Sequence, residues 1–526
     1  MKFSLKTTFL YRLGLLLTLT TAASSCSKDE FLDVNDNPNL PQSVTPNVLL
    51  TGIEATTGFA VGNELGRVTS LLIQHQAGIA NQPATYDTYA LRGAFDNSWN
   101  FELYGGALIN TRLLIDQNQA TNPVYAGLGK LMRAYNFALA TDLWGDVPYS
   151  QANLGPANLQ PRFDAQQDIY QGNTALGIES LFDLVRSGMK DLDNTSNLLL
   201  PGTADDIVYK GDLVKWRRFG NTLLLKLANT ISRKNPDLAR TVINEVLAKG
   251  PTAIITSNTD DFEVPFGTSV GNQNPLYSYN FVNRPDDQMM SRRFLDSLRI
   301  VRIRPASGTP PRPDTVFRND PRLPRFFTTT PRTTAASKTP FGFFTGYDNA
   351  GTQAVPLRVN RSRYAPYVVG VSGEAPVRLV TNFQRAFILA ESALTLGTAG
   401  DAQALFQEGI RASMTKAGVS ATDITAYFVA NPSLVTLSPA AADRDKNLNK
   451  ILTQKWIAWV GNGYEAFNDF RRTGYPRLQI VLFPSSDSPS SIPVRLFYPN
   501  SEISTNTSQV PTPQPNVTAR VWWDID

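Results

Sequence analysis

The residues that could carry chemistry in this chain are few, and they include a lone cysteine and a lone histidine. Cys26 is the only cysteine and His75 the only histidine among 526 residues. A Ser-His-Asp or Cys-His triad therefore has one histidine to draw on, and a zinc site built from several Cys and His ligands is excluded. His75 follows the apolar run Leu71–Ile73 at helical spacing, so we expect it to pack on a helix face.

Three pairs of adjacent acids are the remaining candidates for catalysis, because a glycosidase needs only two carboxylates. They are Asp205-Asp206, Asp260-Asp261 and Asp286-Asp287. Adjacent acids in polar loops are usually solvated, which is a poor setting for a catalytic pair. We therefore expect no enzyme activity and keep a glycan-cleaving enzyme as a distant alternative.

Two segments interleave tyrosines with polar side chains, the composition that a saccharide site requires. A pyranose ring offers an apolar face to an aromatic ring and hydroxyl groups to polar side chains. Each segment could equally be a hydrogen-bonded loop that packs tyrosine onto the scaffold. If both bind, Tyr86→Ala or Tyr277→Ala should weaken binding without lowering the melting temperature. The candidate ligand-binding residues are Asn81, Gln82, Tyr86, Tyr89, Arg92, Tyr277, Tyr279 and Arg284.

The first 25 residues have the order of a secretory signal. A basic start precedes the apolar run Leu13–Ala23, which is shorter than the roughly 20 residues that cross a bilayer. Ala23–Cys26 then looks like a bacterial lipobox. A lone exported cysteine has no disulfide partner, so we predict that residues 1–25 are removed and that Cys26 is acylated, with palmitate for example.

Removal of the signal would leave a nearly neutral protein. The formal net charge of +4 falls to +1, because Lys2, Lys6 and Arg12 are lost and no acid is. No strong field remains to attract nucleic acid, so that class of partner is not expected. Residues 26–46 are rich in Asn, Asp and Pro and are interpreted as a lipidated tether, in which Ser27–Glu30 resembles the surface-export signal of Bacteroidetes lipoproteins.

Helices with apolar stripes must position the candidate residues. Between them, residues 255–375 cluster Pro, Gly, Thr and Arg with short β-prone runs, and their many aromatics argue against disorder. The sequence therefore predicts a mainly α fold of paired helical hairpins with a large, irregular, loop-rich insertion that carries short β pieces. Recurrence at three and four predicts helices from Pro46 and over 99–115, 124–144, 178–189, 216–232, 236–248, 289–298, 380–396, 402–417 and 451–470.

Several short strings occur in a fixed order behind the lipobox. Most are interpreted as fold determinants, and Arg471 and Arg472 are expected to form buried ion pairs with Asp469 or Glu465. The strings are Asp142–Ser150, Arg162–Asp164, Trp216–Phe219, Asn319–Leu323, Phe387–Ala393, Gln454–Ala458, Gly461–Ala466, Arg471–Pro476 and Ile492–Glu502.

With these strings in this order, the chain resembles the SusD/RagB family of nutrient-binding outer-membrane lipoproteins. The resemblance implies a SusD-like body over 47–526. It implies a tetratricopeptide-like helical scaffold in 47–254 and 376–480, a ligand-binding insertion in 255–375 and a C-terminal segment in 481–526.

The same resemblance implies a role at the cell surface. A lipid-anchored outer-membrane protein that faces the exterior would bind a nutrient and deliver it to a SusC-like TonB-dependent transporter, which it covers as a lid. We expect an oligo- or polysaccharide as cargo, with a peptide or other non-sugar nutrient as the alternative. No cofactor is expected. A structural Ca²⁺ stays open, because oxygen ligands abound in the loops although no EF-hand spacing occurs.

Overall fold

The computed structural model describes residues 44–303, 315–330 and 344–525. Cys26, the predicted signal 1–25 and nearly all of the tether 26–46 lie outside these residues. Residues Pro46–Asp526 form one compact unit. Among the residues that the structure describes, no helix is both long and apolar enough to cross a membrane.

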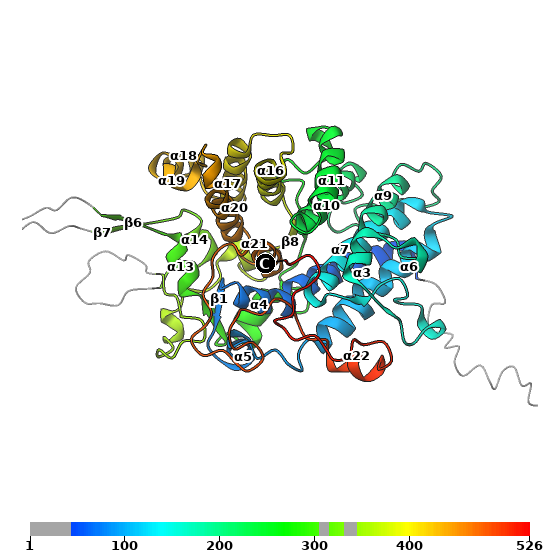
Figure 1. Cartoon of the computed structure of the whole chain (residues 1–526), viewed down its shortest axis with the longest axis horizontal. Coiled ribbons are helices and arrows are strands. Elements are labelled where there is room, and N and C mark those ends of the chain that lie inside the picture. Colours follow the sequence, from blue (N-terminus) through cyan, green and yellow to red (C-terminus); the bar gives the residue numbers. More distant parts are fainter. Residues whose placement is uncertain (1–43, 304–314, 331–343, 526) are drawn as a thin grey trace, which may run out of the picture. The chain divides into compact units, whose positions relative to one another are not determined.

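Pairs of consecutive helices make up most of this unit (Figure 1). The pairs α6/α7, α10/α11 and α16/α17 pack side by side, with α9 between α7 and α10 and with α20 against α16 and α17. This arrangement confirms the predicted mainly α, tetratricopeptide-like scaffold. The scaffold helices are α3 (Pro46–Gly62), α4 (Glu64–Leu72), η2 (Ser98–Leu108), α6 (Ile109–Asn118), α7 (Pro123–Trp144), α8 (Gln166–Gln171), α9 (Leu181–Asp191), α10 (Leu213–Ile231), α11 (Pro236–Ala248), α16 (Asn382–Leu396), α17 (Ala402–Lys416), α18 (Ala421–Ala430), α20 (Arg444–Ala458) and α21 (Gly463–Thr473).

Helix α7, the longest of these helices, is almost wholly buried and carries a polar centre. All but one of its residues are buried, and Gly145 ends it with φ +83°, a conformation that favours glycine. The buried Asp142 carboxylate accepts hydrogen bonds from Tyr464, at 2.8 Å, and Trp523, at 2.9 Å. It also accepts from Tyr170 and Asn468, both at 2.7 Å. Helices α7, α8 and α21 and the C-terminal segment therefore meet at one carboxylate.

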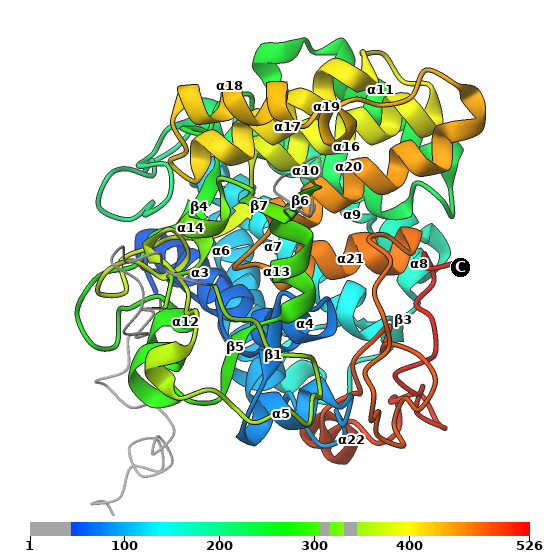
Figure 2. The ribbon, with the colours of Figure 1, turned by 90° about the vertical axis from the view of Figure 1, so that its left-hand side faces the viewer.

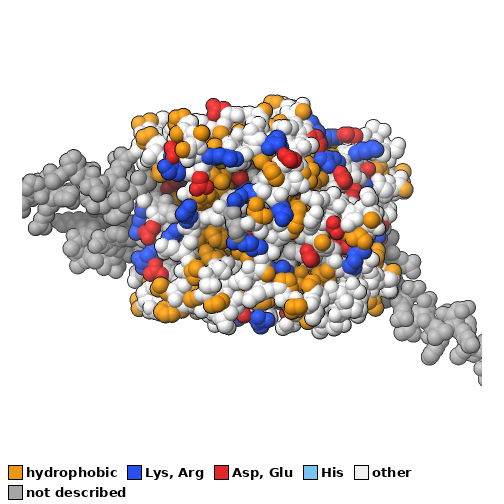
Figure 3. Space-filling view, viewed as in Figure 1, with side chains coloured by type: hydrophobic (Ala, Val, Ile, Leu, Met, Phe, Trp, Pro, Cys, Tyr) orange, Lys and Arg blue, Asp and Glu red, His pale blue; other side chains and the backbone are white. Residues whose placement is uncertain are grey.

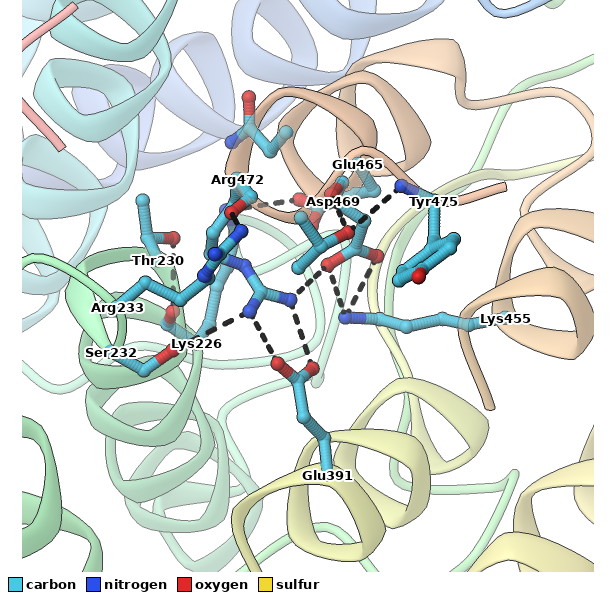
Figure 4. Close-up of polar contacts among 12 residues, drawn as sticks. Lys226, Thr230, Ser232, Arg233, Glu391, Lys455, Glu465, Asp469, Arg472 and Tyr475 are labelled. Atoms are coloured by element: carbon cyan, nitrogen blue, oxygen red, sulfur yellow. Dashed lines mark hydrogen bonds and ion pairs between the residues drawn. The ribbon is translucent and has the colours of Figure 1, made fainter. Parts of the chain in front are cut away.

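A second buried polar cluster joins four helices (Figure 4). Arg472 of α21 donates to Glu391 of α16 at 2.9 Å and to Asp469 at 2.9 Å. Lys455 of α20 donates to Asp469 at 3.0 Å. Lys226 of α10 lies 3.2 Å from Glu465 of α21. The expected ion pair of Arg472 with Asp469 is confirmed.

Arg471 differs from this expectation. Its guanidinium binds the backbone oxygens of Asp142 and Val494 and the Asn468 side chain, and it lies over the Trp523 ring. Arg471 thus holds the C-terminal segment on α7 and α21 and does not pair with Asp469 or Glu465.

Three local predictions are wrong. Residues 451–470 are not one helix, because the chain breaks between α20 and α21 where Gly461 takes φ +94°. His75 lies beyond the end of α4, fully buried, with Nε2 2.9 Å from the Trp456 carbonyl oxygen. The acid pairs are not solvated loops, because each pair has a buried member: Asp206, Asp261 and Asp287.

The face of the molecule shown in Figure 3 mixes charges of both signs with hydrophobic side chains, and neither sign covers it.

The region 255–375 is built from short helices and strands, as predicted, and similar short elements occur elsewhere in the unit. The short helices of the unit are α5 (Asn81–Asp87), α12 (Pro275–Tyr277), η6 (Ser278–Asn283), α13 (Arg292–Leu298), α14 (Leu323–Phe326), α15 (Pro366–Val369), α19 (Pro432–Val435) and α22 (Asn500–Thr505). Its antiparallel strand pairs are β1 (Gln76–Gly78) with β5 (Gln288–Met290), β2 (Val147–Pro148) with β3 (Phe163–Asp164), β4 (Phe262–Val264) with β8 (Val377–Val380), and β6 (Arg299–Ile303) with β7 (Thr315–Asn319).

Candidate functional site

The two tyrosine-rich segments, far apart in sequence, lie side by side in the structure. Strand β1 pairs with β5 in the register Gln76↔Met290 to Gly78↔Gln288. Helix α5 follows β1 and η6 precedes β5, so the strand pair brings both segments to one edge of the molecule (Figure 2). The Asn81 amide donates directly to the Asp287 carboxylate at 2.8 Å.

Tyr279 sits at the junction of the two segments. Its hydroxyl donates to Asp287 at 3.1 Å, and the guanidinium carbon of Arg67 lies 3.9 Å from the centre of its ring. Burial, partly offset by the charge of Arg67, raises the pKa of Tyr279 to about 12. Tyr279 therefore stays a neutral hydrogen-bonding group at neutral pH.

Tyr277 forms an aromatic pair with Phe281, one helical turn later. The ring centres are 5.2 Å apart, the planes are inclined by 7°, and both side chains are partly exposed. Asn274 fixes the start of this turn, since its side-chain oxygen accepts from the Leu276 N–H at 2.9 Å and its amide donates to the Ala375 carbonyl at 2.9 Å. An aromatic surface is thus held in place on a short, capped turn.

Phe281 was missed as a site residue by the sequence reasoning. Its spacing of four from Tyr277 is a signal that could have found it, because residues i and i+4 share one face of a helix. In a loop, which the sequence predicts for this segment, such a spacing carries no information about a shared face.

Tyr86 and Tyr89 do not join this surface, which corrects the sequence prediction. Tyr86 is 3% exposed and Tyr89 1%. The Tyr86 hydroxyl donates to Glu64 at 2.6 Å, and burial raises its pKa. The Tyr89 hydroxyl accepts the Val481 N–H at 3.2 Å. Both rings belong to the core, which leaves neither a face for a ligand.

Of the four polar candidate residues, three are exposed near the aromatic pair or at the start of α5, and one contacts another part of the chain. Asn81 and Gln82 are exposed at the start of α5, and the Gln82 amide donates to Glu64 at 2.9 Å. Arg284 is exposed just after η6. Arg92 instead lies over the Phe497 ring and 3.5 Å from Asp487, so it contacts the C-terminal segment and not the aromatic pair.

The acid pairs are engaged in structural contacts. Asp206 accepts the Trp216 indole N–H at 2.8 Å, and Asp260 and Asp261 pair with Arg218 and Lys416, each at 2.9 Å. Within the described parts of the chain, no group of three or more His, Cys, Asp or Glu side chains is arranged to hold a metal ion. These carboxylates therefore hold parts of the fold together.

Comparison with known proteins identifies relatives of the whole chain. A family model described as "Starch-binding associating with outer membrane", SusD-like, matches residues 38–499. No curated protein sequence matches.

Several solved structures share the fold. A chitin-binding protein is 23% identical with a TM-score of 0.71, over 92% of this chain and 100% of that one. A SusD-like protein from Bacteroides thetaiotaomicron is 22% identical with a TM-score of 0.70, over 92% and 99%. A chitin-binding SusD homolog from Flavobacterium johnsoniae is 22% identical with a TM-score of 0.69, over 91% and 99%.

Proposed function

The chain belongs to the SusD-like family, and from this premise we propose that it is a lipid-anchored outer-membrane protein that binds a glycan at the cell surface. It delivers this glycan to a SusC-like TonB-dependent transporter and cleaves no bond itself. A peptide or other non-sugar nutrient is the competing cargo.

The meeting of the two tyrosine-rich segments carries this proposal. Tyr279 lies between the partly exposed Tyr277 and Phe281 in the chain, and it shares Asp287 with Asn81. A sugar ring can stack on an aromatic face while its hydroxyls bond to amides and carboxylates. Two structural neighbours are chitin-binding proteins, which agrees with a glycan as ligand.

The proposed anchor explains how such a site works with a membrane partner. Two or three acyl chains on Cys26 would hold the protein on the membrane essentially permanently, whereas a single chain binds only marginally. A tether over residues 26–46 would leave the body free to move over a fixed transporter.

Calorimetry on a panel of glycans and oligopeptides tests the proposed cargo. At least one glycan should bind the wild-type protein, and Tyr277→Ala/Phe281→Ala should weaken that binding. Phe428→Ala is a matched control, because Phe428 is also partly exposed on a helix and carries the Arg411 guanidinium 3.8 Å from its ring centre. If oligopeptides bind and no glycan does, the sugar assignment is wrong.

Cell fractionation and uptake assays test the anchor. Cys26→Ser should leave folding and glycan binding unchanged, release the protein from the membrane and abolish uptake. Uptake that persists with the protein still on the membrane would show that the tether, and not the lipid, holds the protein to its transporter.

A further inference from the structure

Four arginines lie on the aromatic pair, just after its turn, or on Asp286, which follows that turn. We call them the arginine rim: Arg284, Arg358, Arg361 and Arg363. The guanidinium carbon of Arg363 lies 3.9 Å from the centre of the Phe281 ring. Arg284 directly follows η6, and its backbone N–H donates to the Tyr279 carbonyl at 2.7 Å. The rim thus draws on two segments that are more than 70 residues apart.

A single carboxylate serves two members of the rim. The Asp286 Oδ1 atom accepts from Arg358 Nε at 2.9 Å and from Arg361 Nη1 at 2.9 Å. The hydrogen bond from Arg358 holds the pKa of Asp286 below its usual range. Asp286 is therefore a fully ionised group that is already shared between two cations.

The other two members of the rim have no such partner. Among the described residues, no carboxylate lies within ion-pair distance of Arg284 or Arg363. Burial lowers the pKa of Arg363, and the positive charge of Arg358 lowers it further. The Arg363 guanidinium donates to the backbone carbonyl of Asn280, which is neutral and leaves the charge of Arg363 uncancelled.

The remaining carboxylates nearby are occupied by other donors. Asp287 accepts from Asn81 and Tyr279. Glu374 accepts the backbone N–H groups of Val371, at 2.8 Å, and Ser372, at 2.7 Å. Neutral donors do not cancel these charges, so the four arginines of the rim face the three carboxylates Asp286, Asp287 and Glu374. One positive charge is left over beside the aromatic pair.

We infer that this surface binds an anionic oligosaccharide, with a sugar ring against the aromatic pair and a carboxylate or sulfate group against the arginine rim. This inference rests on the proposed function, because it names the charge class of the glycan at the same site. The planar guanidinium group binds such oxyanions through two parallel hydrogen bonds. A neutral sugar leaves the guanidinium of the exposed Arg284 to water.

Binding of oligogalacturonate and of its methyl ester to the full chain provides the test. The two probes share a backbone and differ in charge. We expect the acid to bind about tenfold more tightly, with a preference that shrinks as salt rises, because exposed charges are screened. A sulfated oligosaccharide forms a third arm, and its binding in place of oligogalacturonate would identify sulfate as the recognised group.

Three variants assign any preference to the rim. Arg284→Gln/Arg358→Gln should bring the ratio of the two affinities close to one while the ester binds as before. Asp286→Asn, which removes the shared carboxylate, should strengthen binding of the acid. Arg411→Gln is the control, since Arg411 also lies over a phenylalanine ring but on α17, outside the rim.

Two negative results have different meanings. If the ester or a neutral chito- or malto-oligosaccharide binds as tightly as either anionic glycan, the inference is wrong and the proposed function stands. If no glycan of any charge binds, the proposed function itself fails.

Discussion

Arginine has opposite surroundings in the helical scaffold and in the loop region. In the scaffold, Arg472 is almost fully buried and both of its carboxylate partners lie within hydrogen-bonding distance (Figure 4). In the loop region, Arg284 is exposed and pairs with no described carboxylate, while Arg358 and Arg361 share Asp286. A charge that is neutralised inside the protein fixes the fold, whereas one that is left over at the surface is available to a ligand.

The largest expected effect comes from removing the scaffold arginine. Arg472→Leu leaves Glu391 and Asp469 buried with one partner fewer, which should lower the free energy of unfolding by about 3–5 kcal/mol. Denaturant titration measures this loss. Arg284→Gln should leave the denaturation midpoint unchanged. An equal loss of stability in both variants would mean that arginine has the same structural role in the two regions.

Two tyrosines give the same comparison for aromatic side chains. Tyr86→Ala removes a buried ring and a hydrogen bond to Glu64, so we expect a loss of about 3 kcal/mol of stability. Tyr277→Ala should weaken glycan binding with a much smaller loss. Thermal unfolding and calorimetry on both variants separate the roles. A Tyr277→Ala protein as unstable as Tyr86→Ala would place Tyr277 in the core.

Two buried carboxylates contrast in charge. Burial would raise the pKa of Asp469, but Lys455 and Arg472 hold it below its usual range. Asp87 has only neutral donors, from Asn349 and Ala350, and burial raises its pKa to about 7. The loop that contains these two donors is thereby attached to α5.

This difference predicts a pH dependence. Between about pH 4 and pH 7 the folded chain keeps the Asp87 proton and the unfolded chain has lost it, so the stability from this group falls as pH rises. The slope is at most about 1.4 kcal/mol per pH unit. Denaturant titrations across this range should show a steeper fall for wild type than for Asp87→Asn, and parallel curves would refute the raised pKa.

The smallest expected effect concerns two phenylalanines that each carry an arginine. Phe281→Ala should cost about 1 kcal/mol of glycan binding, roughly fivefold in affinity, by removing one ring of the aromatic pair. Phe428→Ala should leave binding unchanged, because Phe428 lies on α18, at the opposite end of the view in Figure 2 from α12. Equal losses would mean that the ligand contacts another face.

Periodicity predicted the scaffold well, because long amphipathic helices repeat their apolar stripe. The predicted helix 236–248 is α11, and 124–144 falls one residue short of α7. The break between α20 and α21 was missed, since apolar residues continue through Trp459 and Val460 until Gly461 turns the chain.

The candidate site was predictable in composition but not in exposure. Tyr86 and Tyr277 occur in equally polar stretches of sequence. Only the fold buries Tyr86 against Glu64 and leaves Tyr277 partly exposed to solvent. Of the arginine rim, only Arg284 was predictable, because Arg358, Arg361 and Arg363 are more than 70 residues away in the sequence. Amino-acid composition therefore indicates which segments could bind a ligand, and long-range packing decides which of their side chains are exposed to it.

The carboxylate of Asp142 joins parts of the chain that are synthesised at different times. Its hydrogen-bond donors all follow it in the chain, and Trp523 lies 381 residues later. Until that indole arrives, a buried carboxylate lacks a donor, and a buried acceptor without its partner is costly. Contacts this distant also form slowly. Early parts of a nascent chain would therefore stay loosely folded during synthesis, the condition in which a polypeptide can still be threaded through a secretion channel.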